Sequence, residues 1–273
     1  MRHPRSILIT GASSGIGAAL AEAYAGDGIV LALGGRDQGR LEAVAQRCRA
    51  KGADTSVASI DVSDRGAIER WVHDADAAAP LDLVIANAAV TGGNRPGQLP
   101  EVLRRAQRLL SVNLFGALNT IHPAMELMIP RRRGQVVLVS SLAAYRGLPY
   151  SPAYSASKAA LRIYGEALRG VLSHHDVTVS VVCPGFVDTP LNETIVSPKP
   201  FMISAPKAAS LIKRKLARRK RVIGFPLSLY LLTLLLVVLP RWLTDYYMTR
   251  MDVTVPQTEL GPDDPQAGPT GET

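Results

Sequence analysis

Cysteine is scarce in this chain of 273 residues, which contains only Cys48 and Cys183. The two lie far apart and neither stands at a metal-ligand spacing, so we expect neither a disulfide framework nor a bound metal. Aromatic residues make up 5% of the chain and hydrophobic residues 47%, which is typical of globular and not of disordered proteins. A reducing, cytoplasmic setting fits this composition best.

Signal-peptide features and internal repeats are also missing. The N-terminus passes from a few basic residues into a short apolar run and then into glycines, without the long apolar region of a signal peptide. The sequence shows no repeat of the kind found in solenoids or propellers. We therefore expect one large α/β domain that is not exported.

The net charge of +8 is concentrated in one segment. Lys213–Arg221 carries seven positive charges and directly precedes the most apolar segment of the chain. That placement favours an anionic membrane surface, and not nucleic acid, as the partner of this basic run. The alternative is a solvated face on the helix before the last strand.

Short β-branched runs alternate with longer helical stretches along the chain. Most of the runs are apolar at consecutive positions, as expected for parallel strands that are covered by helices on both faces. The pattern predicts a Rossmann-like, doubly wound, seven-stranded parallel sheet, which binds its ligand at the carboxyl ends of the strands. The predicted strands are residues 6–10, 28–35, 55–61, 81–87, 134–141, 177–185 and 221–225.

A glycine-rich loop follows the first predicted strand and leads directly into a helical pattern. Residues without a Cβ let the backbone approach a pyrophosphate at the positive N-terminus of the helix. Glycines also close tight turns, but this position makes a dinucleotide site the stronger interpretation. The residues expected to contact the cofactor here are Gly11, Ser13, Ser14, Gly15, Ile16 and Gly17.

The ends of the second and third strands bear on the choice of cofactor. Glycines occupy residues 34–35, where an acid often holds the ribose 2′-hydroxyl, and Arg36 follows them. A guanidinium there can hold a 2′-phosphate, which favours NADP(H) over NAD(H), although Arg36 also fits a solvated helix start. Asp61 and the amide of Val62 are expected to contact the adenine; the alternative role of helix N-cap suits Ser63 better than Asp61.

Tyr154 and Lys158 stand four residues apart, so they lie one turn apart on a predicted helix. An isolated tyrosine has a pKa near 10 and is a poor proton relay at neutral pH. A neighbouring ammonium group favours the phenolate and is expected to lower that pKa. Ser155 and Lys158 also fit a serine acyl-transferase pattern, but its companion motifs are absent.

These motifs together resemble the short-chain dehydrogenase/reductase family over roughly residues 5–225. The sequence "TGASSGIG" is similar to the family's cofactor loop, and "ANAA" resembles the end of its fourth strand, with Ala89 where glycine is usual. Further matching segments are "VNLFG", "LVSSLAAYRG", "YSASK" and "CPGFVDTP". Within them, the residues that carry the resemblance are Asn87, Asn113, Ser141, Tyr154, Lys158 and Pro184.

The resemblance implies the reduction of a carbonyl group by hydride transfer from a nicotinamide. Tyr154 would be the acid/base, Lys158 would tune it and reach the nicotinamide ribose, and Ser141 would hold the substrate oxygen. Asn113 would fix a water that relays protons to Lys158. Further cofactor contacts are expected at Asn87, Pro184, Gly185, Val187 and Thr189, and substrate contacts at Phe186 and Leu191 as well as Ser141.

The C-terminal part departs from a soluble reductase. Residues 222–240 carry no charge, but Pro226 interrupts any helix through them. The remaining residues, 227–239, span roughly 20 Å as a helix, less than the roughly 30 Å hydrocarbon core. A helix lying in the membrane interface, followed by Trp242, Tyr246 and Tyr247, fits better. Alternatively, this helix packs on the sheet or on a second subunit.

We thus predict three parts: a catalytic NAD(P)-binding domain at residues 1–225, an apolar helix at 226–250 and a disordered tail at 251–273. The expected function is an NADPH-preferring carbonyl reductase of an apolar or lipid-linked substrate. We expect the protein to be cytoplasmic or peripheral on the inner membrane face, and to form a homo-oligomer. The alternatives are a soluble reductase or dehydrogenase of small ketones, alcohols or sugars whose C-terminal helix forms an oligomer contact, and a non-catalytic NADP-binding regulator.

Overall fold

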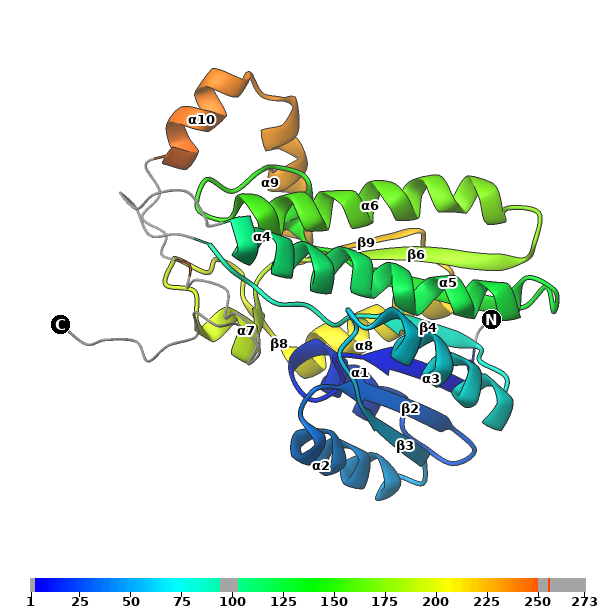
Figure 1. Ribbon diagram of the computed structural model, residues 1–273. Coiled ribbons are helices and arrows are strands. Elements are labelled where there is room, and N and C mark those ends of the chain that lie inside the picture. Colours follow the sequence, from blue (N-terminus) through cyan, green and yellow to red (C-terminus); the bar gives the residue numbers. More distant parts are fainter. Residues whose placement is uncertain (1–2, 94–102, 250–254, 256–273) are drawn as a thin grey trace.

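The computed structural model of the chain describes residues 3–93, 103–249 and 255. Its centre is a seven-stranded parallel sheet with the order β3-β2-β1-β4-β5-β6-β9 (Figure 1). The prediction of a doubly wound sheet is confirmed, with small differences at the strand ends. The strands are β1 Ser6–Thr10, β2 Val30–Gly35, β3 Asp54–Ser59, β4 Leu83–Ala86, β5 Gly134–Val139, β6 Val177–Pro184 and β9 Val222–Phe225.

Helices cover both faces of the sheet (Figure 1). The α-helices are α1 Gly15–Tyr24, α2 Gln38–Arg49, α3 Arg65–Ala78, α4 Leu103–Leu110, α5 Gly116–Met128, α6 Pro152–Leu172, α7 Pro190–Glu193, α8 Ala205–Ala217, α9 Leu227–Val238 and α10 Arg241–Thr249. A π-helical turn, Ser111–Phe115, joins α4 to α5, and a 3-10 turn, Leu142–Ala144, follows β5.

Two apolar cores lie on opposite faces of the sheet. Ile7 and Ile9 of β1 pack with α1, α2 and α8, whereas Leu8 faces the core formed with α3, α5 and α6. Successive side chains of a strand point to opposite faces, so a strand buried on both sides must be apolar at every position. This explains the continuous apolar runs in the sequence.

The strand order reverses beside β1, which has β2 on one side and β4 on the other. In doubly wound sheets such a reversal marks the ligand-binding place, at the carboxyl ends of the strands. The glycine loop follows β1 and Asn87 follows β4, so both lie at this place.

Aspartates begin the two helices that follow β2 and β3. The side chain of Asp37 accepts a hydrogen bond from the amide of Arg40, and that of Asp64 from the amide of Ala67, both at 2.9 Å. Ser63 is the alternative N-cap that the sequence suggests for the helix after β3. The N-cap of α3 is Asp64, one residue later. Asp64 takes that position because its carboxylate reaches the amide three residues ahead.

A two-stranded sheet of β7, Val187–Asp188, and β8, Ile203–Ser204, was not predicted. Strands of two residues are too short to show a periodic pattern in a sequence. Its two strands lie before and after α7 in the chain, and Thr189, which faces the glycine loop, lies between β7 and α7.

The helices α9 and α10 form a hairpin that projects from the body beside the start of α6 (Figure 1). Helix α9 starts directly after Pro226, as the proline predicts. Within the described part of the chain, we find no helix that combines the length and apolar character needed to cross a bilayer. The predicted disordered tail lies outside the described residues, apart from Val255.

The basic run and the apolar helix lie at opposite ends of the parallel strands. We call the side where the strands begin the amino edge and the side where they end the carboxyl edge. Helix α8 ends before β9 starts and α9 begins after β9 ends, while β9 runs parallel to β6. The basic residues that end α8 are therefore at the amino edge, and α9 is at the carboxyl edge. The basic run and the apolar helix, which adjoin in sequence, are therefore separated by the length of a strand.

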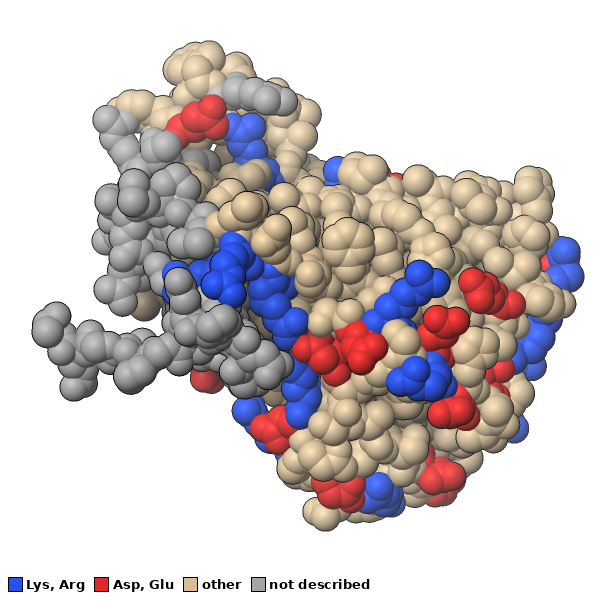
Figure 2. Space-filling view, viewed as in Figure 1, with Lys and Arg blue, Asp and Glu red and all other residues tan. Residues whose placement is uncertain are grey.

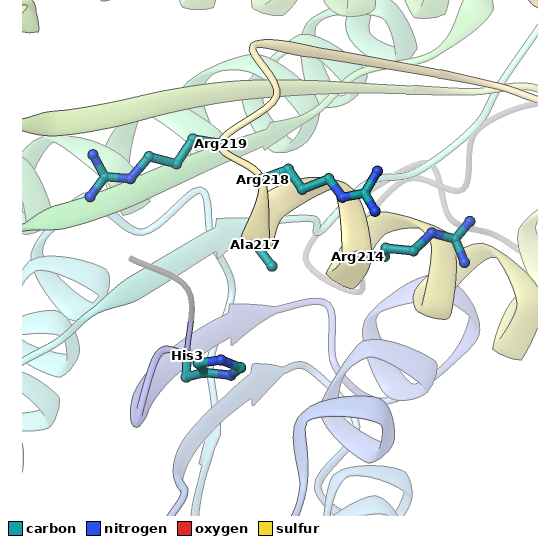
Figure 3. Close-up of a pocket in the computed structure, with 5 residues that line it drawn as sticks. All are labelled: His3, Arg214, Ala217, Arg218 and Arg219. Atoms are coloured by element: carbon teal, nitrogen blue, oxygen red, sulfur yellow. The ribbon is translucent and has the colours of Figure 1, made fainter.

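A hollow of about 640 Å³ at the amino edge contains part of the basic run (Figure 3). Its lining residues are His3, Arg214, Ala217, Arg218 and Arg219. The guanidinium groups of Arg214 and Arg218 extend to one side and that of Arg219 to the other, so they do not converge on one point (Figure 3). This hollow lies at the opposite end of the strands from the glycine loop.

Candidate active site

Ser141, Tyr154 and Lys158 come together at the carboxyl end of β5. Pro152 starts α6, which places Tyr154 in its first turn and Lys158 one turn later. The Ser141 side chain lies close enough to the Tyr154 hydroxyl to lower the pKa of the phenol. The Lys158 ammonium lies 5.8 Å from the centre of the Tyr154 ring and donates to the carbonyl oxygen of Val139 at 3.0 Å.

Burial controls the protonation of this group. It raises the pKa of Tyr154, an effect that the neighbouring Ser141 side chain partly offsets. It also lowers the pKa of Lys158 to about 8. The expected lowering of the tyrosine pKa by Lys158 is not found in this structure, because removal of both groups from water disfavours their charged forms. At neutral pH the Tyr154 hydroxyl is thus protonated.

Asn113 is fully buried in the π-helical turn. Its Oδ1 accepts from the amide of Val90 at 2.8 Å, and its Nδ2 donates to the Val90 carbonyl at 3.0 Å and to the Ser157 hydroxyl at 3.2 Å. Ser157 in turn donates to the carbonyl of Tyr154 at 2.7 Å. Asn113 therefore fastens the loop after β4 to the helix that carries the tyrosine.

The glycine loop takes a conformation that requires glycine. Gly11 and Gly15 have φ angles of +65° and +56°, in the left-handed region that other residues adopt at a cost. A Cβ on Gly17 would collide with the carbonyl of Gly11. Ser14 precedes α1 in an extended conformation and its side chain makes no capping hydrogen bond within the described residues. The first amides of α1 thus fit the phosphates of a dinucleotide.

Asn87 braces this loop against the end of β4. Its Nδ2 donates to the carbonyls of Thr10 and Gly11 at 3.0 and 3.2 Å. The Thr10 hydroxyl accepts from the amides of Asn87 and Ala88 at 3.0 and 3.2 Å. The Asn87 side chain therefore shapes the cofactor loop, and Thr10, which the sequence reasoning did not single out, completes the brace.

Asp61 is held by side chains on two elements. It accepts from the amide and the hydroxyl of Ser63 at 2.8 and 2.6 Å, and from Arg108 of α4 at 2.6 Å. Burial raises its pKa, but these hydrogen bonds outweigh burial and hold the pKa at about 2. Val62, next to it, packs against Gly116. The sequence reasoning missed Arg108, because nothing in the sequence connects α4 with the end of β3.

Arg36 is exposed directly after β2, and the Ser59 hydroxyl donates to its carbonyl at 3.1 Å. Gly35 has space for a Cβ, which would lie 3.4 Å from the Ser13 hydroxyl. Gly34 has another role. A Cβ there would collide with the ring of Trp71, so the absence of a side chain lets this ring pack against β2. Ser13 and Gly35 are therefore neighbours, and Arg36 lies next to them in the chain.

The loop after β6 reaches the glycine loop. A Cβ on Gly15 would lie 3.1 Å from the Thr189 methyl group, so Thr189 faces the cofactor loop. Gly185 donates its amide to the Phe225 carbonyl at 2.7 Å, which ties the loop to β9. Pro184 and Val187 are buried, and Phe186 and Leu191 are half-buried. The structure thus brings all of the expected cofactor segments to the carboxyl edge.

Comparison with known proteins identifies the family. Residues 5–200 match the family model described as short chain dehydrogenase. The chain belongs to this family. An uncharacterised oxidoreductase of Myxococcus xanthus is 36% identical over 90% of this chain and 97% of its own length. The ketoacyl reductase HetN of Nostoc is 30% identical over 76% of this chain and 72% of its own.

Solved structures of short-chain dehydrogenases share the fold and hold nicotinamide cofactors. The enzyme of Sphingobium yanoikuyae, in complex with NADPH, has a TM-score of 0.73 at 25% identity and covers 81% of this chain and 87% of its own. That of Burkholderia phymatum, in complex with NAD, has a TM-score of 0.78 at 24% identity over 86% and 94%. The chain is an oxidoreductase of this family and uses an NAD(P) cofactor.

Proposed function

We propose that this short-chain dehydrogenase is an NADPH-preferring reductase of an apolar or lipid-linked carbonyl compound. The observation that carries the proposal is the meeting of half-buried Ser141 and Tyr154 with buried Lys158, beside a loop suited to dinucleotide phosphates. The second function from the sequence, a non-catalytic regulator, would not need a tyrosine and a lysine at these two positions.

Each side chain has a chemical role in this proposal. NADPH, when bound, supplies a hydride to the carbonyl carbon. Ser141 holds the carbonyl oxygen, and Tyr154 gives it the proton that completes the alcohol. The raised pKa of Tyr154 keeps that proton available at neutral pH. Lys158 then returns a proton to the tyrosine, through a water that we assign to the lone pair of Asn113 Oδ1 left open by Val90.

The preference for NADPH rests on the end of β2. An acid at this place would repel a 2′-phosphate, whereas Gly35 leaves space and Arg36 supplies a guanidinium. The neighbouring hydroxyl of Ser13 adds a hydrogen-bond donor. Asp61, held by Ser63 and Arg108, keeps lone pairs for the adenine amino group at the next strand.

The substrate class rests on the side chains around the carboxyl edge. Phe186 and Leu191 line the loop after β6, and Phe201 and Met202 are exposed on the segment before α8. The printed name of the Nostoc relative, a ketoacyl reductase, supports a ketone on an acyl chain. An apolar compound of this kind is met at a lipid surface, which makes a peripheral membrane location part of the proposal.

NADPH oxidation by the purified protein tests the proposal, with short-chain and long-chain ketones compared with and without lipid vesicles. We expect turnover of long-chain ketones, faster with vesicles, and its loss in Tyr154→Phe. Equal turnover of short ketones, indifferent to vesicles, would replace the apolar substrate with a small soluble one. Tight NADPH binding without turnover of any ketone would favour the regulator.

A further inference from the structure

Helix α9 is apolar nearly all round, including the face that it turns to solvent. Thr233 is its buried residue and satisfies its hydroxyl by donating to the Leu229 carbonyl at 2.8 Å. Its outward face is apolar, and Leu231, Leu235 and Val238 are 56%, 52% and 77% exposed. Ordinary surface helices bury such a stripe, so this outward face requires an apolar partner.

Helix α10 extends the same surface. Trp242 is 74% exposed, and Leu243 and Tyr246 are also exposed. Tryptophan and tyrosine are the side chains that favour the boundary between acyl chains and water. The space-filling view shows the hairpin as mostly uncharged, in contrast with the lower half of the same face (Figure 2).

A neutral lipid surface fits this hairpin better than an anionic one. The basic run that would attract anionic headgroups lies at the amino edge, with its guanidinium groups around the hollow near His3 (Figure 3). Helix α9 has twelve residues and is about 18 Å long. It can lie in a membrane interface but is too short to span the hydrocarbon core of a bilayer. The hairpin also stands at the carboxyl edge, where an apolar substrate must arrive.

The inner side of the hairpin contacts the segment that joins Ser141 to Tyr154. The hydroxyls of Tyr145 and Tyr230 are 3.5 Å apart and their rings meet edge to face. Arg146 donates to the hydroxyl of Thr244 at 2.6 Å and pairs with Asp245. These contacts come from both helices of the hairpin and meet two consecutive residues of the segment.

Leu229 adds an apolar contact at the base of the hairpin. A Cβ on Gly185 would lie 2.7 Å from a Leu229 methyl and 3.3 Å from one of Leu142, so α9 packs between the loop after β6 and the residue next to Ser141. Helix α9 thus contacts segments on both sides of the carboxyl edge.

We infer that the α9–α10 hairpin inserts its outward face into the acyl region of a lipid surface, and that its inner face then holds residues 142–151 in the conformation that aligns Ser141 with Tyr154. Arg146 and Asp245 are positioning residues in this arrangement. The coupling to turnover rests on the proposed function, whereas insertion and ordering of the segment do not.

Sedimentation with neutral phosphatidylcholine vesicles tests the insertion. We expect binding that persists at high salt and falls roughly tenfold or more in Leu231→Ser/Leu235→Ser/Val238→Ser. Val171→Ser is the matched control for Val238→Ser, because it makes the same change at a residue that is 67% exposed on α6. Binding only to anionic vesicles, lost in Arg218→Gln/Arg219→Gln, would overturn insertion, as would a stable dimer that hides the hairpin and binds no vesicle.

Hydrogen exchange at residues 142–151 tests the coupling without any substrate. Vesicles should slow exchange there in the wild type but not in Arg146→Asp, which should still bind vesicles. The exchanged pair Arg146→Asp/Asp245→Arg should restore the protection. Where turnover is found, vesicles should raise kcat more than they lower KM, and Arg146→Asp should lose that gain. Equal protection in the wild type and Arg146→Asp would overturn the coupling even if NADPH turnover is normal.

Discussion

The ammonium group of Lys158 donates a 3.0 Å hydrogen bond to the carbonyl oxygen of Val139, the last residue of β5. The hydroxyl of Ser140 donates back to the Lys158 carbonyl at 2.7 Å. These two bonds fix α6 against the strand end that carries Ser141. The relative position of Ser141 and Tyr154 thus depends on the strand as much as on the helix.

Replacement of Tyr154 by phenylalanine should remove the proton donor and leave the cofactor loop intact. We expect kcat for ketone reduction to fall by roughly 10²- to 10⁴-fold, with NADPH affinity changed little. Stopped-flow absorbance and a fluorescence titration of NADPH measure the two effects. Tyr150→Phe is the control and should keep its activity; a Tyr154→Phe variant with normal kcat would remove Tyr154 from the reaction.

The stability of the folded protein should rise with pH just above neutrality because of Lys158. Its pKa in the folded chain is about 8, against a usual 10.5, so above pH 8 the unfolded chain binds a proton that the folded chain does not. The free energy of unfolding then increases with pH. Burial raises the pKa of Cys183 from 9.0 to about 11, which opposes this effect above pH 9.

Urea unfolding between pH 8 and pH 9 measures this effect. The wild type should gain stability across the interval relative to Lys158→Met, which has no titrating group at that position. Parallel pH dependence in the two proteins would mean that the buried lysine does not titrate in this range.

The residues after β2 should set the cofactor preference. Arg36→Gln should weaken NADPH binding by roughly 10- to 150-fold, the range expected for loss of a hydrogen bond to a charged group, and should change NADH binding little. Gly35→Asp should add repulsion of the 2′-phosphate and a partner for the ribose hydroxyls of NADH. Calorimetric titration with both cofactors checks this, and Arg65→Gln on α3 is the control. Equal losses for NADPH and NADH would contradict it.

Two glycines on helices should respond oppositely to alanine. A Cβ on Gly17 would collide with the Gly11 carbonyl, so Gly17→Ala should lose cofactor binding and roughly 1–3 kcal/mol of stability. Gly170 has nothing within 4 Å of its Cβ position, so Gly170→Ala in α6 should gain about 0.5–1 kcal/mol. Thermal unfolding and NADPH titration separate the two. A Gly17→Ala protein with normal affinity would show that the loop relaxes.

The sequence by itself determined the seven strands of the main sheet, the glycine loop and the Tyr154–Lys158 pair. Parallel strands buried on both faces must be continuously apolar, and a left-handed turn at a phosphate loop selects glycine at Gly11 and Gly15. Tyr154 and Lys158 are four residues apart on one helix, so their proximity follows from helical geometry alone. These features depend on local interactions, which a sequence displays directly.

Only the tertiary structure decided what depends on contacts between distant segments. It paired Asp61 with Arg108, fastened Asn113 to Val90, and joined Arg146 to Asp245 across nearly a hundred residues. It also placed the basic run and the apolar helix at opposite edges, although they adjoin in sequence, because one strand carries the chain across the sheet between them. Burial, which sets the pKa of Tyr154 and Lys158, exists only once the helix has packed on the sheet.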